Sequence, residues 1–310
     1  MTGKIILIGN VNIDLVMGPV AEWPTVGTET VVPHSDWRVG GASGNTALAL
    51  DAIGCRYQLI ANRSDDDFGK WLAKTFITHS DKWSLAAGSA GLSVGITHPD
   101  GERTFFTSLG HLNAFSYEDV IPQLPSIGDG DIVLLSGAFV TPKLLPNYGK
   151  LIQELKRRGF RVALDTGWPT EGWTVEMRDI VQSWCAHCDH VLINESEMIG
   201  LAGAMNVPLK SAMQILSKKM PSDSSLVVKC GPDGAVAFCN GRLIKSDSPL
   251  VNVIDTIGAG DIFNAGYLNS FIQNKSLTDA LNAAVEMASL AISSHPRRYL
   301  KKLTQELVAS

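Results

Sequence analysis

The residues best able to do chemistry stand together in one short stretch, Gly258-Ala259-Gly260-Asp261. Its glycines leave no Cβ between the backbone amides and an incoming ligand. A helix that begins at Asp261 would direct its free N–H groups and the positive end of its dipole to the same point, which makes an anion site. A carboxylate beside that site can take the proton of an attacking hydroxyl. The stretch therefore predicts phosphoryl transfer, with Asp261 as general base and the Gly258 to Gly260 turn as anion hole.

Asp261 also has a simpler explanation, as an ordinary helix N-cap after a glycine turn. Ser or Thr would serve stability better there, because a carboxylate repels a phosphate bound at the same helix end. We therefore expect Asp261 to be an ionised base. The stretch is not a dinucleotide fingerprint, since Phe263 stands where the third glycine would be, and no Gly-Lys-Ser/Thr of a Walker A loop follows.

The elements that must position this stretch alternate along the chain. Val251, Val253 and Ile254 predict a strand before the glycines, and residues 261–273 predict a helix that is buried on most sides. Strands and helices alternate upstream as well, which indicates an α/β fold with a doubly wound, mostly parallel sheet flanked by helices. The predicted strands include 4–8, 57–61, 132–136, 161–165, 191–194, 226–229 and 235–239, and the predicted helices include 67–78, 142–158, 175–184, 209–219 and 277–293.

Two β-rich segments do not follow this alternation. Residues 13–40 and 91–111 predict a small β-sheet lid, and residues 1–12, 41–90 and 112–310 predict the main α/β domain that binds nucleotide and substrate. One face of the lid is predicted to be apolar. A homodimer that pairs this face with a second copy, and a monomer that turns it to its own pocket, both fit. The apolar residues of this face are Val31, Val39, Val94, Ile96 and Phe106.

Composition sets bounds on partners and location. The 310 residues are 45% apolar and carry a net charge of −5, which indicates a sizeable core and no nucleic-acid surface. The basic residues Arg297, Arg298, Lys301 and Lys302 are expected to form a solvated tail. The N-terminal apolar run is too short for a signal peptide and no apolar run reaches 18 residues, so we expect no membrane partner and a cytoplasmic location.

Two other motifs carry less weight. The five cysteines predict reduced thiols, and the run from Cys185 to His190 lacks the second cysteine pair of a structural zinc site. The string Gly91-Leu92-Ser93-Val94-Gly95 matches the nucleophile elbow of hydrolases. That elbow requires a strand, a tight turn and a helix, whereas here an apolar alternation continues past Ser93, so Ser93 is predicted to lie within a strand.

The string from Asp255 to Asp261, Asp-Thr-Ile-Gly-Ala-Gly-Asp, resembles the C-terminal signature of the PfkB, or ribokinase-like, family of carbohydrate kinases. The resemblance extends over nearly the whole chain, with the family's motifs in order. It implies an enzyme that uses ATP and Mg²⁺ to phosphorylate a hydroxyl of a sugar or sugar derivative. A nucleoside kinase of the same fold remains an alternative. A catalytically silent nucleotide or sugar-binding regulator is a second alternative, although such a protein has no need of the base Asp261.

The resemblance assigns a sugar site to the first part of the chain. Asn12 and Asp14 match the family's early polar pair, which bonds sugar hydroxyls, although Asn and Asp are also common in turns. Gly40, Gly41 and Asn45 resemble the Gly-Gly signature, in which glycine backbone and an Asn side chain approach the sugar. These glycines require a close approach either of a ligand or of another chain segment.

Two further segments resemble the family only in part. Arg103, within Gly101-Glu102-Arg103, resembles the lid segment that reaches over the substrate, and an exposed hairpin arginine fits as well. Asp165 and Trp173 resemble a family stretch whose Asn and Arg are replaced here by Gly167 and Pro169. Ala42 stands where ribokinase carries a Lys, which weakens ribokinase as the specific identity.

The nucleotide site is assigned by resemblance to the second half of the chain. Asn194 and Glu197 match the family's Asn-x-x-Glu, whose oxygens suit a hydrated Mg²⁺ on the phosphates, and a helix-capping pair fits as well. Lys229, Gly231 and Gly234 resemble the nucleotide loop.

Two more assignments by resemblance complete the set. Asn282 resembles the Asn that flanks adenine. Asp255 and Thr256 match residues that hold a monovalent cation in many members, so the resemblance allows K⁺ as a cofactor. The segment Ser293 to Pro296, where the C-terminal part of that cation site would lie, does not resemble the family.

Overall fold

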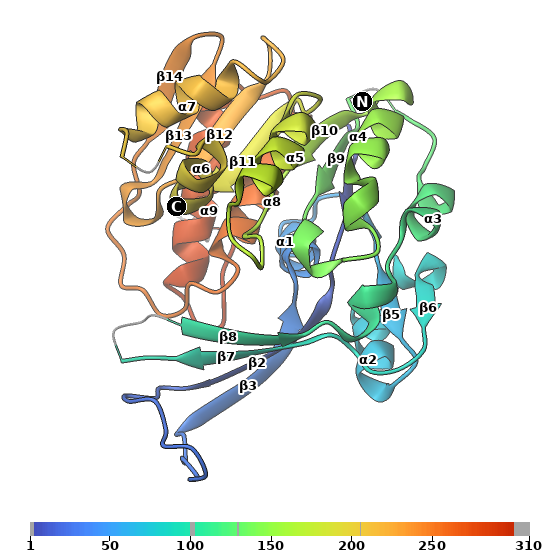
Figure 1. Ribbon diagram of the computed structural model, residues 1–310, viewed down its shortest axis with the longest axis vertical. Helices are drawn as coiled ribbons and strands as arrows, with labels where there is room; N and C mark the ends of the chain where they lie inside the picture. The colour runs from blue at the N-terminus through green and yellow to red at the C-terminus, as the bar shows by residue number, and fades with distance from the viewer. Residues whose placement is uncertain (1–2, 100–102, 129, 205, 301–310) are drawn as a thin grey trace, which may run out of the picture.

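The computed structural model describes residues 3–99, 103–128, 130–204 and 206–300. Its centre is an eight-stranded sheet in the order β14-β13-β12-β11-β10-β9-β1-β4 (Figure 1). Every neighbouring pair from β12 to β4 is parallel, and β13 and β14 add an antiparallel edge. The strands are β1 Ile5–Ile8, β4 Tyr57–Ile60, β9 Ile132–Leu135, β10 Arg161–Leu164, β11 His190–Asn194, β12 Ser225–Lys229, β13 Ala235–Cys239 and β14 Arg242–Ser246.

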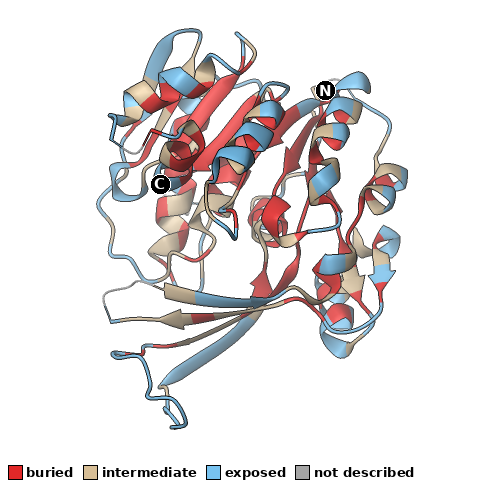
Figure 2. Ribbon diagram, viewed as in Figure 1, coloured by how far each residue is buried: buried red, intermediate tan, exposed pale blue. Residues whose placement is uncertain are grey.

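Helices cover both faces of this sheet, as the apolar strands require. In β1, Ile5 and Leu7 belong to one buried cluster and Ile6 and Ile8 to another, because successive side chains point to opposite faces. Figure 2 shows the central strands buried along most of their length. The first cluster lies under α1 Ala42–Ala52, α2 Asp67–Thr75, α8 Ala259–Ile272 and α9 Leu277–Ile292, and the second under α3 Tyr117–Val120, α4 Tyr148–Arg157, α5 Val175–Cys185, α6 Glu195–Ala202 and α7 Leu209–Ser217.

The predicted lid is a separate four-stranded sheet in the order β3-β2-β7-β8. It lies beyond the carboxyl ends of the central strands, at the foot of Figure 1. Val39, Val94, Ile96 and Phe106 share one of its faces, as the strand register shows, whereas Val31 lies outside the strands. The lid strands are β2 Asn12–Gly18, β3 His34–Gly40, β7 Leu92–Thr97 and β8 Arg103–Ser108, and a small third sheet pairs β5 Asn62–Ser64 with β6 Ser84–Ala86.

Three local predictions need correction. The strand predicted at residues 251–254 does not form, and Val253 and Ile254 are exposed, so the segment has no buried face to pair. Asn12 and Asp14 lie on strand β2 and not in a turn. Strand β14 was not predicted, although its turn carries the Asn-Gly signal of a hairpin, with positive φ at both Asn240 and Gly241.

Ser93 lies within β7, as its alternating pattern predicts. Among the described helices, none has both the length and the apolar character needed to cross a membrane.

Candidate active site

The site is built on the amino end of α8. Gly258 is the N-cap residue of this helix and has left-handed backbone angles, φ 75° and ψ 8°. The helix buries residues on all its sides, which fixes it between α1 and the sheet. A Cβ at Gly258 would lie 3.1 Å from Cγ of Asn45, so glycine is required both by the backbone and by the neighbour. This turn therefore brings α1 and the start of α8 into contact.

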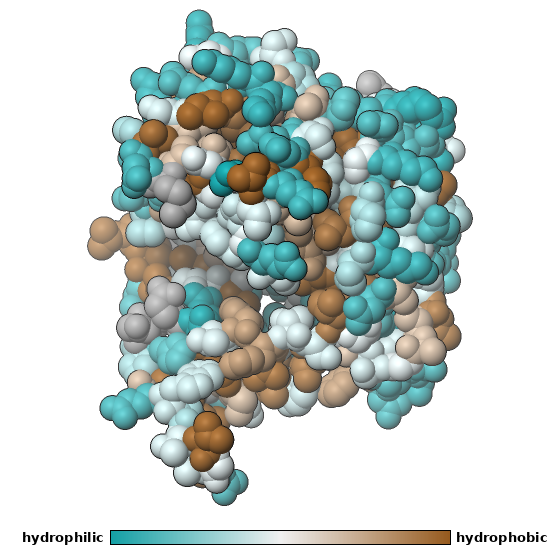
Figure 3. Space-filling model, viewed as in Figure 1, coloured by the Kyte–Doolittle hydropathy of each residue, from teal (hydrophilic) through white to brown (hydrophobic). Residues whose placement is uncertain are grey.

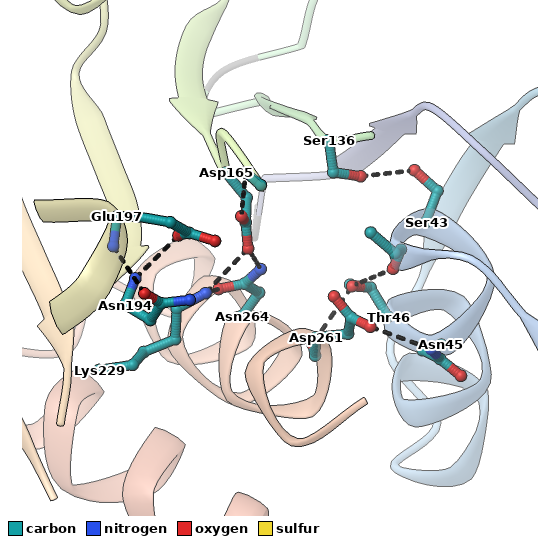
Figure 4. Close-up of polar contacts among 12 residues, drawn as sticks. Ser43, Asn45, Thr46, Ser136, Asp165, Asn194, Glu197, Lys229, Asp261 and Asn264 are labelled. Atoms are coloured by element: carbon teal, nitrogen blue, oxygen red, sulfur yellow. Dashed lines mark hydrogen bonds and ion pairs between the residues drawn. The ribbon is translucent and has the colours of Figure 1, made fainter. Parts of the chain in front are cut away.

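Asp261 lies in the first turn of α8, after the N-cap. Its carboxylate accepts a hydrogen bond of 3.0 Å from Nδ2 of Asn45, and its backbone carbonyl accepts one of 3.2 Å from Oγ1 of Thr46 (Figure 4). The simpler explanation of Asp261 as N-cap is wrong, because Gly258 takes that place and no side chain caps the helix.

The protonation of Asp261 differs from the expectation. Burial, aided by the charge of Asp165, raises the pKa of this carboxyl to about 8, although Asn45 and Lys229 act to lower it. In the ligand-free chain the neutral form therefore predominates at pH 7, because burial outweighs the helix end. A base whose pKa lies near the working pH is nonetheless well matched to proton transfer.

The predicted sugar residues lie together beside Asp261. Nδ2 of Asn12 donates to the Asp14 carboxylate at 3.0 Å, and both side chains are buried. Burial raises the pKa of Asp14 to about 6, against the lowering effect of Arg38. A side chain at Gly40 would overlap the Asp14 carboxylate, and a Cβ at Gly41, whose φ is 85°, would lie 2.6 Å from Oδ1 of Asn12. The close approach that the glycines permit is thus to these two side chains.

Arg103 is not brought to this group of residues. Asp14 pairs with Ser93 of β7, and Ser93 pairs with Thr107 of β8. Arg103 is on the same face as Thr107 but four residues further along β8, about 13 Å at the usual rise per residue. Gly101 and Glu102 lie outside the described residues.

A buried charged cluster lies on the other side of Asp261. Nζ of Lys229 is 2.8 Å from Oδ2 of Asp165, and Nδ2 of Asn264 donates to the same oxygen at 2.6 Å (Figure 4). Burial would lower the pKa of Lys229, but the charges of Asp165 and Glu197 raise it above its usual range, so the ammonium stays charged. A Cβ at Gly260 would lie 3.4 Å from Nζ, which places this cation against the first turn of α8.

Asn194 and Glu197 form the capping pair that was kept as an alternative. Oδ1 of Asn194 accepts from the Glu197 amide at 2.8 Å, and the Glu197 carboxylate accepts from the Asn194 amide at 2.9 Å. Burial and the charge of Asp165 raise the pKa of Glu197. The donor set of amide and carboxylate oxygens fits a hydrated Mg²⁺, although the described residues contain no group of three His, Cys, Asp or Glu placed to ligate a metal directly.

The remaining predicted nucleotide residues lie in the loop after β12 and, for Asn282, on α9. Gly231 and Gly234 have positive φ in the turn between β12 and β13, and a side chain at Gly234 would overlap Ser246. After β14, the hydroxyl of Ser248 lies 3.2 Å from that of Ser289 on α9. Asn282 is exposed and lies seven residues before Ser289, which is about 10 Å along the helix axis. Its place beside adenine stays a prediction.

Asp255 is held by two arginines. Nη1 of Arg38 and Nη2 of Arg297 each lie 2.6 Å from its Oδ2. Burial alone would raise the pKa of Asp255, but these guanidinium groups and the Ile257 amide hold it below its usual range. The expectation that Arg297 belongs to a solvated tail is therefore wrong, and Lys301 and Lys302 lie outside the described residues. The Thr256 carbonyl accepts from the Ala259 amide at 3.1 Å.

Sequence reasoning missed Asn264, Arg38 and Arg297. Asn264 could have been found, because it follows Asp261 by three residues and so lies on the same side of the helix. Arg38 and Arg297 stand in segments with no recognised motif, and only the fold brings them to Asp255.

Figure 3 shows a recess between the lid and the main body. Two other cavities lie at the amino ends of the strands and contain none of the predicted residues. One, of about 520 Å³, lies between α7 and the β13–β14 turn, and the other, of about 430 Å³, lies next to Arg161. The candidate site lies instead at the carboxyl edge, where open α/β sheets bind ligands.

Comparison with known proteins gives consistent relatives. The ribokinase of Arabidopsis thaliana is 23% identical over 299 residues, covering 93% of this chain and 76% of that protein. The 2-dehydro-3-deoxygluconokinase of Haemophilus influenzae is 26% identical over 309 residues, covering 93% of each. Among solved structures, the adenosine kinase from Sinorhizobium meliloti superposes with a TM-score of 0.79 at 17% identity, covering 97% of both chains.

The structure of Arabidopsis thaliana ribokinase complexed with ribose and ATP superposes with a TM-score of 0.73 at 21% identity, covering 95% of this chain and 94% of that one. These structural likenesses establish the ribokinase-like fold, with its mostly parallel sheet and separate lid. The family model described as pfkB family carbohydrate kinase matches residues 2–300. With this match over nearly its whole length, the chain belongs to the pfkB family of carbohydrate kinases.

Proposed function

We propose that this kinase transfers the γ-phosphoryl group of ATP to a hydroxyl of a sugar or sugar derivative, with Asp261 as general base. One observation carries the proposal. Asp261 lies in the first turn of α8 and is bonded to Asn45 on the sugar side, while the Lys229 cation stands against the same turn on the other side. A base and an anion site thus meet at one point, as phosphoryl transfer requires.

On the sugar side, Asn12, Asp14 and Asn45 would hydrogen-bond the substrate hydroxyls, and Gly40 and Gly41 keep the backbone close to them. Hydrogen bonds already orient these groups, Asn12 with Asp14 and Asn45 with Asp261, so little side-chain ordering is needed on binding. Closure of the lid would exclude water from the transfer and limit ATP hydrolysis.

On the nucleotide side, the amides of Gly258 and Gly260 would stabilise the charge of the transferred group, whereas the predicted third donor, the Ala259 amide, already donates to the Thr256 carbonyl at 3.1 Å. Lys229 adds a fixed positive charge beside Gly260, and the loop with Gly231 and Gly234 would contact the nucleotide. Mg²⁺, held through water by Asn194 and Glu197, would supply positive charge to the β- and γ-phosphates.

The substrate class is tested by a coupled assay of ADP release over sugars, sugar acids, sugar phosphates and nucleosides. Arg38 lies opposite Asp14 in the lid sheet, and its Nε and Nη2 are buried without hydrogen-bond partners. Anionic sugars belong in the panel because their acidic group could accept from these nitrogens. Stimulation by a sugar or sugar derivative supports the proposal, and stimulation by nucleosides alone would make the chain a nucleoside kinase. Binding of ATP with no turnover on the whole panel would favour a silent regulator.

The role of Asp261 is tested by Asp261→Asn. Loss of the base should lower kcat by roughly 10²-fold to 10⁴-fold, the usual contribution of general base catalysis. ATP binding, measured by calorimetry, should stay within a few-fold, because the amides of the anion hole are retained. A variant with nearly wild-type turnover would remove Asp261 from the mechanism.

We also propose that the outer face of the lid forms a homodimer. Leu15, Trp37, Val94, Ile96 and Phe106 lie on the face opposite to Asp14. Trp37 and Phe106, on the two edge strands of this face, are 48% and 54% exposed, which is high for large apolar residues.

A further inference from the structure

Arg297 supports the segment that leads into the amino end of α8. Nη2 of Arg297 donates to Oδ2 of Asp255 and to the carbonyl oxygen of Ile257, both at 2.6 Å. Asp255 in turn accepts from the Ile257 amide at 2.9 Å through its other oxygen. Both Arg297 and Asp255 are largely covered, so this charge is poorly screened by solvent.

The position of this guanidinium bears directly on the anion hole. In a trans peptide the N–H points away from the C=O, so a cation on the Ile257 carbonyl lies behind the Gly258 N–H. The positive charge polarises that peptide and strengthens the amide as an anion donor. The segment is also anchored at its base, because the Ile292 carbonyl accepts from the amides of Ile254 and Asp255 at 2.8 and 3.1 Å.

These oxygens do not fit a bound K⁺, the cation left open by the sequence. An alkali cation needs several unoccupied oxygen donors, whereas Oδ2 of Asp255 already accepts from Arg38 and Arg297. The Ile257 carbonyl is taken by the same nitrogen of Arg297. Two guanidinium groups facing one carboxylate leave the site positive, so a further cation would be repelled.

We propose that the guanidinium of Arg297 is a built-in replacement for a monovalent cation behind the anion hole, and that the enzyme works without K⁺. This proposal rests on the proposed kinase function for its kinetic test alone. Arg297 acts through the Ile257–Gly258 peptide and is thus a positioning residue. Removal of the Arg297 side chain should therefore create a cation site.

The kinetic test compares wild type, Arg297→Ala and Arg298→Ala in KCl and in tetramethylammonium chloride at equal ionic strength. Wild-type kcat should be the same in both salts. Arg297→Ala should lose roughly 10-fold to 100-fold in tetramethylammonium, as when outer groups that orient a site are removed, and should recover much of this in KCl or with added guanidinium. The exposed neighbour Arg298 serves as the control, with no loss in either salt.

A second measurement needs no substrate. K⁺ should raise the melting temperature of Arg297→Ala above that in tetramethylammonium, and should leave wild type unchanged. In crystals soaked in Tl⁺, an anomalous peak beside Asp255 is expected for the variant only. A wild-type enzyme activated or stabilised by K⁺, or an Arg297→Ala variant that neither salt nor guanidinium affects, would overturn the proposal. If no panel compound is phosphorylated, the melting and Tl⁺ results still decide it.

Discussion

At the scale of single residues, burial determines the pH at which Asp261, the proposed general base, is ionised. Its pKa of about 8 means that the carboxylate is the minor form at neutral pH in the free enzyme. Since only the ionised form accepts a proton, kcat/KM should fall about tenfold for each pH unit below this value and level off above it. The measurement is a pH profile of kcat/KM, which reports the free enzyme. A profile that stays flat between pH 6 and 9 would contradict the assignment.

A second carboxyl complicates this profile and supplies its control. Burial also raises the pKa of Asp14, to about 6, so its ionisation could produce an acidic limb of its own. Asp14→Asn removes that titration and should weaken sugar binding, but the limb near pH 8 should remain. If the limb disappears with Asp14, the titrating base is Asp14.

Lys229 illustrates how strongly a buried charge depends on its partners. The Lys229 and Asp165 side chains are only 13% and 11% exposed, so removal of the ammonium leaves Asp165 and Glu197 buried without a counter-charge. Lys229→Met should lower the free energy of unfolding by about 3 kcal/mol, measured by urea denaturation.

The matched control is Lys70→Met, which breaks an exposed ion pair with Asp67 and should leave the free energy of unfolding nearly unchanged. The double variant Lys229→Met, Asp165→Asn should recover part of the loss, because it removes one of the stranded charges. Equal effects of the two lysine substitutions would show that the buried cluster contributes nothing to the folded state.

At the scale of elements, the turn before α8 couples backbone conformation to the position of the base. Gly258→Ala forces a side chain into left-handed backbone and towards Asn45, whose amide holds Asp261. The left-handed conformation should reduce stability by about 1–2 kcal/mol. Displacement of Asn45 should in addition lower kcat.

Gly54 provides a control that separates these two effects. Its φ is 67°, and no heavy atom lies within 4 Å of a Cβ built there. Gly54→Ala should therefore show a similar loss of stability in thermal unfolding with unchanged kcat. If Gly258→Ala keeps full turnover as well, the contact between the turn and Asn45 does not matter for catalysis.

Much of the architecture could be predicted from local patterns because each element carries its own signal. The apolar strands and the amphipathic helices follow from periodicity, and the lid follows from two segments that break the alternation. The segment 251–254 misled because β-branched residues favour strands only when they have a partner strand, and here Val253 and Ile254 face solvent. Strand β14, Arg-Leu-Ile-Lys-Ser, lies at the sheet edge and is mostly exposed, so its residues do not show the polar and apolar alternation of a half-buried strand.

At the scale of the whole molecule, the site joins residues that lie far apart in sequence. Asn45 and Asp261 are separated by 216 positions, and Arg38 and Asp255 by 217. Motif spacing could propose members such as Asp261, but it could not find Arg297, because the contact of Arg297 with Asp255 is not set by local sequence. The order of strands in the sheet decides which carboxyl ends meet.

The outer face of the lid leaves apolar side chains uncovered, and a second copy of the chain could cover them. Trp37 stacks on Phe68 at 5.1 Å and Phe106 on Trp23 at 5.8 Å, so one aromatic pair lies at each edge of this face. Light scattering after gel filtration should give twice the 33.3 kDa chain mass. Phe106→Lys should give the monomer, because a charge buried in an apolar interface would have no partner. Leu243→Lys, on exposed β14, should remain dimeric, and a monomeric wild type would show that the face serves its own chain.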